Sequence, residues 1–367
     1  MPPSRLGEPR WGDPGLGEPD LEEPGLEEPD LVDRGLGGLH RRVTDWFAAN
    51  ARDLPWRRPE CTPWGVMVSE FMLQQTPVAR VLPVWEEWME RWPEPADLAA
   101  EPAGEALRAW GRLGYPRRAL RLHGAAQRIV EEHGGRVPSA HADLLALPGV
   151  GAYTAAAISC FAFGAPETVV DTNIRRVHAR LVSGRALPEP SYTAAEARLA
   201  EALMPAREQD GGRLANAWNA AVMELGALVC TARSPRCPQC PVADVCAWVG
   251  AGQPEPHYVP KGQPWAGTDR QVRGAFMAVL RASEVPVRRA ELLGASGRVP
   301  NPAAPAEDTA SGDTALGNTV SGDPALAAAW KRLAGLSAPA DQRLRCLDGL
   351  LADGLAHEGP EGVALPH

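Results

Sequence analysis

Residues 230–246 read CTARSPRCPQCPVADVC and contain four cysteines, separated by six, two and five residues. Four thiolates on one short loop can surround a single metal centre, and such soft ligands select zinc or an iron–sulfur cluster. This spacing is not typical of the disulfides of a secreted protein. The sequence therefore predicts a metal centre, and leaves zinc and iron–sulfur open at this point. Its ligands are Cys230, Cys237, Cys240 and Cys246.

Around this loop, residues 39–250 show helical periodicity of apolar side chains almost throughout, and no sustained alternation with a period of two. Short connections that contain Gly or Pro separate the periodic segments. The sequence therefore predicts an all-α domain. Its expected helices cover 40–50, 69–79, 105–110, 118–132, 153–163, 172–181, 193–204 and 216–230.

The two ends of the chain have a different character. Residues 1–38 repeat a short acidic unit that is rich in Pro and Gly, which predicts a disordered tail. A Pro/Gly-rich linker is expected at 251–268, followed by a small winged-helix-like unit at 269–367 with a disordered insertion at about 295–325. The expected elements of this unit are helices at 271–282, 288–293 and 342–354, and a β-hairpin within 355–366 that turns at 359–362.

The chain of 367 residues has a formal net charge of −9, but residues 1–38 account for most of it, with ten acidic residues against three arginines. The rest of the chain is nearly neutral, so a basic DNA-binding face is not excluded. No apolar run approaches 18 residues and no signal peptide is recognisable, which predicts a cytoplasmic protein.

The stretch Leu147–Gly151, LPGVG, lies between two expected helices. Its two glycines permit a tight turn and a close approach of the backbone to a ligand. The amide groups of Gly149, Val150 and Gly151, at the start of the next helix, are suited to hold a phosphate oxygen. A turn that only packs two helices is the alternative. Arg233 and Arg236, in the cysteine loop, could also meet phosphates.

Two carboxylates are candidates for chemistry. Glycosidic-bond cleavage needs a proton donor beside the leaving group and an anion beside the sugar. Asp171 precedes the expected helix at 172–181, where it suits an N-cap, and Glu70 lies among apolar neighbours, which would raise its pKa. Each residue also has a non-catalytic interpretation. Asp171 could be an N-cap aspartate, and Glu70 could be a solvent-exposed carboxylate on its helix.

These motifs resemble, in the same order, those of the MutY-type adenine DNA glycosylases, which belong to the helix–hairpin–helix superfamily of endonuclease III. The resemblance covers residues 39–250 and rests on SEFMLQQT at 69–76, VDTNIRRV at 170–177, RDLPWR at 52–57, residues 111–115, LPGVGAYT at 147–154 and the cysteine spacing. It implies a two-lobed helical fold with an iron–sulfur loop. The implied cofactor is a structural [4Fe–4S] cluster, and the implied partner is double-stranded DNA with adenine opposite 8-oxoguanine or guanine.

The same resemblance implies the roles of individual residues. Glu70 protonates the leaving adenine, and Asp171 stabilises the sugar cation. Tyr153 and Asn173 orient this pair. The residues expected to bind the flipped adenine or to enter the base stack are Arg52, Trp56, Arg57, Leu73, Gln75 and Tyr115, and those expected to contact DNA phosphate are Gly149, Val150, Gly151 and Arg175.

In lyase relatives a lysine just after the hairpin attacks the sugar, and here this position holds Tyr153. No lysine precedes Lys261, so the resemblance implies a hydrolase without strong lyase activity. A thymine glycosylase that acts on T·G mismatches and a catalytically silent mismatch-binding protein are the alternatives. The run Gln74-Gln75-Thr76 favours adenine.

The chain departs from the family after residue 262, because the pattern of a Nudix-like C-terminal domain is missing. The small C-terminal unit takes its place, with an expected role in DNA contact or packing. We expect a monomer in the bacterial cytoplasm that associates with the nucleoid when it acts.

Overall fold

The computed structural model describes residues 36–206, 209–260, 262, 264–294 and 323–367. The described chain is mostly helical, and its only strands form one short hairpin, which confirms the predicted fold class. None of the described helices has the length and apolar character to cross a membrane. The predicted tail, apart from residues 36–38, and most of the predicted insertion lie outside the described residues. Residues 36–38 are not tail, because helix α2 (Leu36–Asn50) already begins there.

The first lobe is built around a tryptophan-rich core. Trp88 contacts both Trp92 and Trp110 edge to face, with ring centroids 4.8 and 5.6 Å apart, and all three are fully buried. Such contacts hold the surrounding helices at fixed angles. These helices are α3 (Pro63–Leu73), α4 (Val78–Arg91), α5 (Pro95–Ala99), α6 (Ala103–Trp110), α7 (Arg117–His133), α8 (His141–Ala146) and α9 (Ala152–Phe163).

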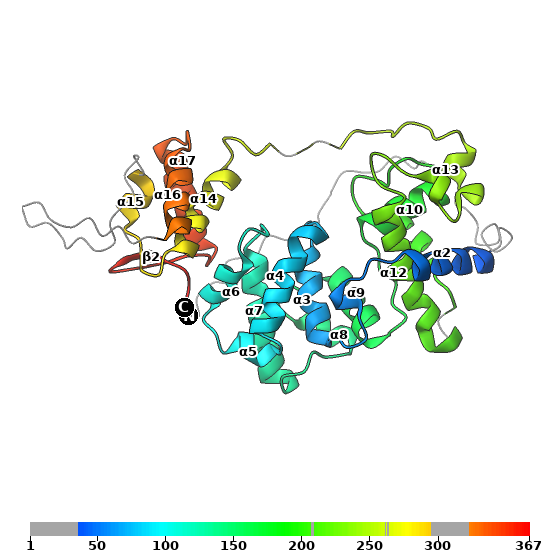
Figure 1. Cartoon of the computed structure of the whole chain (residues 1–367), viewed down its shortest axis with the longest axis horizontal. Helices are drawn as coiled ribbons and strands as arrows, with labels where there is room; N and C mark the ends of the chain where they lie inside the picture. The colour runs from blue at the N-terminus through cyan, green and yellow to red at the C-terminus, as the bar shows by residue number, and fades with distance from the viewer. Residues whose placement is uncertain (1–35, 207–208, 261, 263, 295–322) are drawn as a thin grey trace, which may run out of the picture.

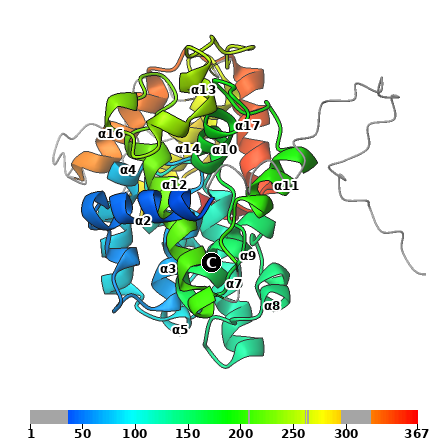
Figure 2. The same cartoon turned by 90° about the vertical axis from the view of Figure 1, so that its right-hand side faces the viewer.

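The second lobe joins the N-terminal helix to the later part of the domain. Helix α2 packs across α12 (Figure 2), and a separate core around Val43, Ile174 and Trp218 fills this lobe. Its other helices are α10 (Thr172–Leu181), α11 (Ala194–Ala202), α12 (Arg213–Leu228) and α13 (Ala247–Gly250). The cysteine loop follows α12 and contains the 3₁₀ turns η3 (Cys237–Gln239) and η4 (Ala243–Val245).

The C-terminal unit lies beside the first lobe, and the described residues between α13 and α14 run from one end of the molecule to the other (Figure 1). It contains α14 (Asp269–Ala282), α15 (Arg289–Gly294), α16 (Pro324–Ala334), α17 (Ala340–Ala352) and the antiparallel strands β1 (His357–Gly359) and β2 (Gly362–Ala364). Val287 adds an isolated bridge to Val363.

The contact between this unit and the first lobe is specific. Arg281 Nε donates to the Leu107 carbonyl at 2.8 Å, and Gly104 N donates to the Pro366 carbonyl at 2.7 Å. One continuous apolar core also extends from the first lobe into the unit. The two parts therefore form one packed body.

The expected helix over 69–79 is wrong, because the chain breaks between α3 and α4. Gln75 adopts φ +55°, which a helix does not allow, and Pro77 is the N-cap of α4. The guanidinium of Arg118 takes up the carbonyls that the break exposes. It donates to the carbonyls of Phe71 and Gln74 at 2.9 and 2.5 Å. The buried Arg118 therefore stabilises the loop 74–77 between the two helices. The periodicity of the sequence does not indicate this break.

Candidate active site

A large cleft, of about 2550 Å³, runs between the two lobes and along the C-terminal unit. Thirteen of the residues that line it are arginines, and only Glu70, Asp171 and Asp353 are acidic. In a chain of net charge −9, the cleft therefore concentrates positive charge, which suits a polyanionic ligand.

Glu70 lies on α3 and points into this cleft. Its side chain is buried, with 7% of its surface exposed, because α3 carries apolar residues around its whole circumference. Burial raises the pKa of the Glu70 carboxyl to about 7, and the nearby Asp171 carboxylate acts in the same direction. The expectation of a raised pKa is confirmed. A carboxyl group with this pKa can donate a proton at neutral pH.

Tyr153, in the first turn of α9, makes a hydrogen bond with Glu70 that partly lowers the pKa of the carboxyl. Burial, and then the neighbouring carboxylates, raise the pKa of Tyr153 itself, so its hydroxyl remains protonated and donates. Tyr153 therefore fixes the direction of the Glu70 side chain.

Asp171 caps α10, as the sequence predicts. Its Oδ1 accepts from the backbone amide of Ile174 at 2.7 Å, and its Oδ2 accepts from Nδ2 of Asn173 at 2.7 Å. Burial raises the pKa of Asp171, while these hydrogen bonds act against the rise. Two donors thus hold the carboxylate in one orientation, with one face open to the cleft.

Glu224, on α12, belongs to the site although the sequence did not single it out. It has no exposed side-chain surface and accepts from Arg52 at 2.7 Å through both oxygens and from Arg57 at 2.9 Å. Burial raises its pKa, but the two guanidinium groups outweigh burial and lower the pKa to about 2. This permanently charged carboxylate fixes the two arginines at the cleft wall. The sequence feature that could have identified Glu224 is its position as an acidic residue within the otherwise apolar run Val222–Leu225.

Trp56 and Leu73 form apolar walls beside the carboxylates. Trp56 is also a core residue, because only 7% of its surface is exposed and its ring meets Trp85 edge to face at 5.6 Å. Trp56 therefore both packs in the core and lines the cleft. Arg57 lies near enough to Glu70 to lower its pKa slightly.

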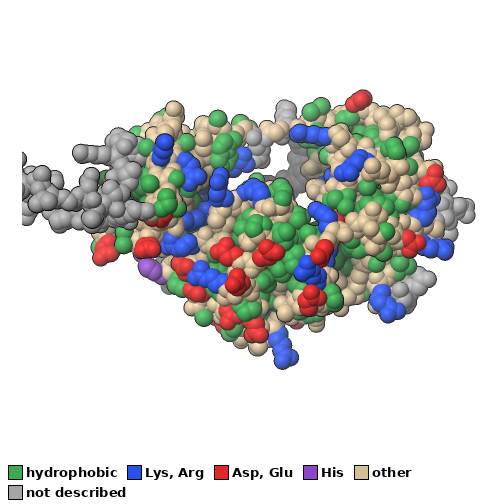
Figure 3. Space-filling view, viewed as in Figure 1, with side chains coloured by type: hydrophobic (Ala, Val, Ile, Leu, Met, Phe, Trp, Pro, Cys, Tyr) green, Lys and Arg blue, Asp and Glu red, His purple; other side chains and the backbone are tan. Residues whose placement is uncertain are grey.

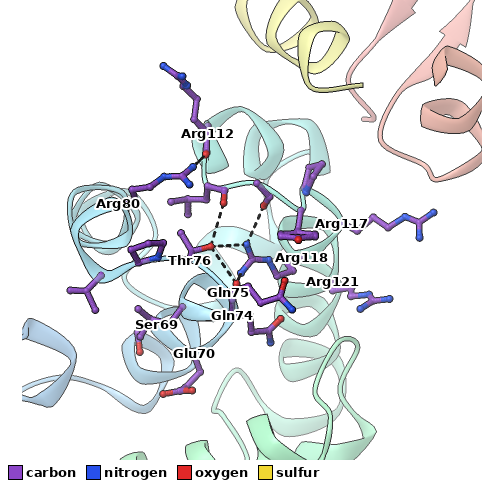
Figure 4. Close-up of a pocket in the computed structure, with 18 of the residues that line it drawn as sticks. Ser69, Glu70, Gln74, Gln75, Thr76, Arg80, Arg112, Arg117, Arg118 and Arg121 are labelled. Atoms are coloured by element: carbon purple, nitrogen blue, oxygen red, sulfur yellow. Dashed lines mark hydrogen bonds between the residues drawn. The ribbon is translucent and has the colours of Figure 1, made fainter. Parts of the chain in front are cut away.

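Gln75 stands on the loop 74–77 (Figure 4), and Tyr115 stands on the loop 111–116 between α6 and α7. We call these two loops the wedge loops. Both residues have positive φ, +55° and +48°, and the ring of Tyr115 is 49% exposed. The Tyr115 ring is therefore not part of the core. Arg118 holds both loops, because its NH1 and NH2 groups donate to Gln74 O, Thr76 Oγ1 and Gly114 O. Backbone strain of this kind accumulates where a protein contacts a ligand.

The hairpin between α8 and α9 has the expected form. Gly149 adopts φ +80°, and a Cβ there would lie 2.7 Å from Cβ of Arg121, so glycine is required. Gly151 is the N-cap of α9 and leaves its surroundings open, while Val150 is buried beneath the turn. The exposed N-terminus of α9 can accept an anion.

The prediction that Arg175 contacts phosphate is not supported. Its NH2 donates to both oxygens of Glu196 at 2.9 and 2.8 Å, and to the carbonyls of Glu189 and Ser191. Only 11% of the Arg175 side chain is exposed. The arginine is used to hold the loop before α11, so it has little capacity left for a phosphate.

The four cysteines lie close together on the loop after α12. Burial, and then the proximity of the other three sulfurs, raise the pKa of Cys240 to about 11. Arg180 and Gln253 donate to sulfur, at 3.4 Å from Cys230 Sγ and 3.2 Å from Cys237 Sγ. A cysteine with three other sulfurs nearby, and donors directed at two of those sulfurs, fit the charge of a thiolate-bound cluster. Among the described residues, no group of three or more His, Cys, Asp or Glu side chains is placed to hold a single metal ion.

Arg176 connects the cysteine loop with the carboxylates. Its Nε donates to the Cys230 carbonyl at 2.7 Å, and its NH2 donates to the Gly226 carbonyl and to Asn173 Oδ1. Gly226 itself permits the approach, because a Cβ would lie 2.7 Å from Cβ of Asn173. The position of Asn173, and through it Asp171, therefore depends on the path of the cysteine loop.

Comparison with known proteins now agrees with this geometry. Residues 68–203 match the model of the HhH-GPD superfamily base excision DNA repair proteins, and residues 230–246 match the iron-sulfur binding domain of endonuclease III. Fold and site thus define a DNA-binding base excision DNA glycosylase with a [4Fe–4S] cluster, and the zinc alternative is not supported.

Two relatives define the family further. An adenine DNA glycosylase of Mycobacterium tuberculosis is 53% identical over 249 residues, which cover 67% of this chain and 80% of the relative. An adenine DNA glycosylase of Mycolicibacterium smegmatis is 45% identical, over 87% of this chain and 93% of the relative. The chain belongs to the adenine DNA glycosylase family. A solved thermostable thymine-DNA glycosylase also matches, with a TM-score of 0.53 and 28% identity over 60% of this chain and all of that one.

Proposed function

We propose that the protein is a monofunctional DNA glycosylase that hydrolyses the N-glycosidic bond of adenine mispaired with 8-oxoguanine or guanine, in base excision repair. The observation that carries the proposal is the pair of buried carboxyl groups. Glu70 has a pKa of about 7, and Asp171, held by two donors, faces the same cleft. Two carboxyl groups whose environments differ can divide the roles of acid and anion between them.

In the proposed reaction, the protonated Glu70 donates its proton to N7 of adenine. The bond between C1′ and N9 then breaks, and its electron pair leaves with the base. The Asp171 carboxylate stabilises the positive charge on the sugar. A water molecule adds its oxygen to C1′ and returns a proton to Glu70, which restores the starting state. Tyr153 and Asn173 keep the two carboxyl groups oriented throughout.

We assign the recognition of the flipped base to Arg52, Trp56, Arg57 and Leu73, which line the cleft beside Glu70. Extruding a base costs a few kcal/mol of stacking. We assign the filling of the vacated space to Gln75 and Tyr115, and their position on the wedge loops at the cleft supports this assignment. The amides of Gly149, Val150 and Gly151 would hold a phosphate of the same strand. The cluster on Cys230, Cys237, Cys240 and Cys246 supplies structure, since it fixes the loop that Arg176 contacts.

A hydroxyl at Tyr153 cannot form the Schiff base that lyase relatives form through a lysine amine. This favours attack by water and disfavours strand cleavage. The alternative is a thymine glycosylase that acts on T·G mismatches, since a solved thymine-DNA glycosylase shares the fold. Both mycobacterial relatives are named adenine DNA glycosylases, which favours adenine.

We further propose three functional segments: the glycosylase domain at 39–250, the linker at 251–268 and a winged-helix-like unit at 269–367. The helices α14 to α17 and the hairpin β1–β2 support the last of these assignments. We propose a monomer that acts on chromosomal DNA in the cytoplasm.

The test compares base release from duplexes with A·8-oxoguanine, A·G and T·G pairs. We expect adenine release from the first two and no release of thymine. The Glu70→Gln variant should bind the A·8-oxoguanine duplex and release nothing. Release of thymine alone would refute the adenine assignment, and turnover by Glu70→Gln would refute the role of Glu70. Tight mismatch binding without any release would favour the silent binder.

A further inference from the structure

Glu224 differs from the acidic side chains on the surface of the molecule in its burial. On the face shown in Figure 3, acidic and basic side chains lie interspersed on the surface of the first lobe, where solvent weakens their attraction. Among the described acidic residues, only Glu70 and Glu224 are buried, and Glu224 has no exposed side-chain surface. Because a buried carboxylate is costly unless it is well paired, Glu224 and the arginines that bind it form one unit behind the cleft wall.

Arg57 is the arginine of this unit whose charge acts on Glu70. It ends the 3₁₀ turn η1 (Pro55–Arg57), which packs against α3. Its guanidinium lines the same cleft as Glu70 and lowers the pKa of the Glu70 carboxyl, although burial has the larger and opposite effect. The two side chains are therefore close enough to interact, and they carry groups that attract each other when Glu70 is ionised.

The hydrogen bonds of Arg57 are incomplete. Its NH2 donates to Oε2 of Glu224 at 2.9 Å, and its guanidinium lies over the ring of Phe47, at 5.5 Å from the centroid. Its NH1 is buried, and among the described residues no atom accepts from it. A buried charged donor without an acceptor is unfavourable. Without Glu224, two nitrogens of this guanidinium would lack an acceptor, and an ion pair with Glu70 would satisfy both.

An ion pair between Arg57 and Glu70 would remove the proton that the reaction needs. An opposite charge within about 4–6 Å lowers the pKa of a carboxyl group by about 1–3. Glu70 would then be a carboxylate at neutral pH and could not protonate a leaving base. The site thus requires that Arg57 lines the cleft without binding Glu70.

The other groups that surround Glu70 cannot neutralise it. Arg118, on α7, is bonded to backbone carbonyls at the end of α3, and α4 packs against α3 through Trp85. Burial raises the pKa of the remaining tyrosine and thiol, so both stay uncharged, and the third group is a carboxyl. These groups are Tyr153 and Cys160 on α9 and Asp171 at the start of α10.

We propose that Glu224 is a positioning residue, which holds Arg57 in the cleft wall and so prevents its guanidinium from forming an ion pair with Glu70. Glu224 does not touch the base in this assignment, and it acts through Arg57 alone. The inference rests on the proposed function, because it concerns the group that donates the proton. It gives the cleft wall a second task beside recognition of the base, which is to keep the acid protonated.

The experiment compares the pH dependence of base release in single turnover, with the full-length protein in excess over an A·8-oxoguanine duplex. The test variants are Glu224→Gln and Glu224→Gln/Arg57→Met, the second of which also removes the cation. The first control, Glu224→Gln/Arg52→Met, removes the other arginine of the same unit. The second control, Glu196→Gln, removes a carboxylate that binds Arg175 and does not line the cleft. Thermal unfolding checks that each variant is folded.

In Glu224→Gln the alkaline limb of the pH profile should move to lower pH by about 1–2. Above the pKa of Glu70, each pH unit changes the protonated fraction about tenfold. Release at pH 8 should therefore be about 10- to 100-fold slower, whereas release at pH 5 should change by less than about threefold. The position of the limb is the readout, because a lost contact with the base or a folding defect slows release at every pH.

Removal of Arg57 should reverse the effect. Glu224→Gln/Arg57→Met should return the limb to the wild-type position or to slightly higher pH. The control with Arg52→Met should keep the lowered limb, and Glu196→Gln should keep the wild-type limb. Glu224→Asp, whose shorter side chain holds Arg57 less closely, should move the limb in the same direction by a smaller amount. It replaces Glu224→Gln in each comparison if that variant does not fold.

Infrared difference spectroscopy titrates Glu70 without any reaction. The C=O band of its protonated carboxyl is identified by its absence from Glu70→Gln. This band should disappear at lower pH in Glu224→Gln than in wild type, and Arg57→Met should reverse the change. An equal loss of release at every pH, or a limb that stays low after Arg57→Met, would overturn the inference. A wild-type chain that releases no adenine would refute the proposed function, and the infrared titration would still decide whether Glu224 keeps Arg57 from Glu70.

Discussion

Glu70 in the cleft and Glu224 behind its wall are both buried but have opposite surroundings, and their replacement by glutamine should change stability in opposite directions. For Glu70, burial raises the pKa from 4.5 to about 7. Between these two values the unfolded chain releases the proton while the folded chain keeps it, so each pH unit favours unfolding by about 1.4 kcal/mol. Above pH 7 the total cost is about 3 kcal/mol. The Glu70→Gln variant avoids this cost, so it should be more stable than wild type by about 3 kcal/mol at pH 8.

Glu224 is the matched comparison, because it is equally buried but bound by Arg52 and Arg57, which hold its pKa at about 2. Its lowered pKa contributes about 3 kcal/mol of stability, which is present above pH 4.5 and lost as the pH falls through 2. The Glu224→Gln variant should therefore be less stable than wild type by about 3 kcal/mol at neutral pH, with a smaller difference in acid.

Urea unfolding, followed by circular dichroism at pH 4.5, 6 and 8, measures the effect of Glu70→Gln, and a further series at about pH 3 measures the smaller difference expected for Glu224→Gln in acid. The stability gained by Glu70→Gln should be near zero at pH 4.5 and grow to its full value at pH 8. A difference between Glu70→Gln and wild type that does not depend on pH would refute the reasoning, since it would mean that the carboxyl group titrates alike in the folded and unfolded chains.

Three further predictions concern the groups around these carboxylates. Tyr153→Phe removes a hydrogen bond that lowers the pKa of Glu70, so the alkaline limb of the pH profile of base release should move to higher pH; a shift to lower pH would contradict the assignment. Arg118→Met leaves the carbonyls of both wedge loops without a donor, and should lower the free energy of unfolding in urea by about 3 kcal/mol; a loss below about 0.5 kcal/mol would show that the arginine does not hold the loops. Gly226→Ala places a Cβ 2.7 Å from that of Asn173, and should cost about 1–3 kcal/mol of stability and slow single-turnover base release; unchanged release would separate this contact from the site.

Those parts of the site that depend on local sequence could be predicted. Asp171 was expected as an N-cap because an aspartate before a helical run can accept the first free amide groups, and the structure has this hydrogen bond at 2.7 Å. The turn at 147–151 followed from the backbone freedom of Gly149. The four cysteines followed from their spacing on one loop, since only a short loop has to fold to bring them together.

The parts that depend on distant partners could not be predicted. Glu224 meets Arg52 across 172 positions of the chain, and no local pattern states that this pairing exists. The break after α3 follows from Arg118, 42 positions beyond Thr76, whereas the periodicity of 69–79 favoured one helix. An arginine at position 175 is suited to bind phosphate, but its guanidinium instead donates to Glu196 on a neighbouring helix. In each case a contact remote in sequence outweighs the local tendency.

Incubation of the wild-type protein with an A·8-oxoguanine duplex, with and without borohydride, tests the central claim most directly. The released base is identified by mass spectrometry, and the strands are resolved before and after alkali. The account predicts free adenine, an intact strand that breaks only in alkali, and no covalent adduct between protein and DNA. Strand cleavage without alkali, an adduct trapped by borohydride, or the absence of adenine would contradict it.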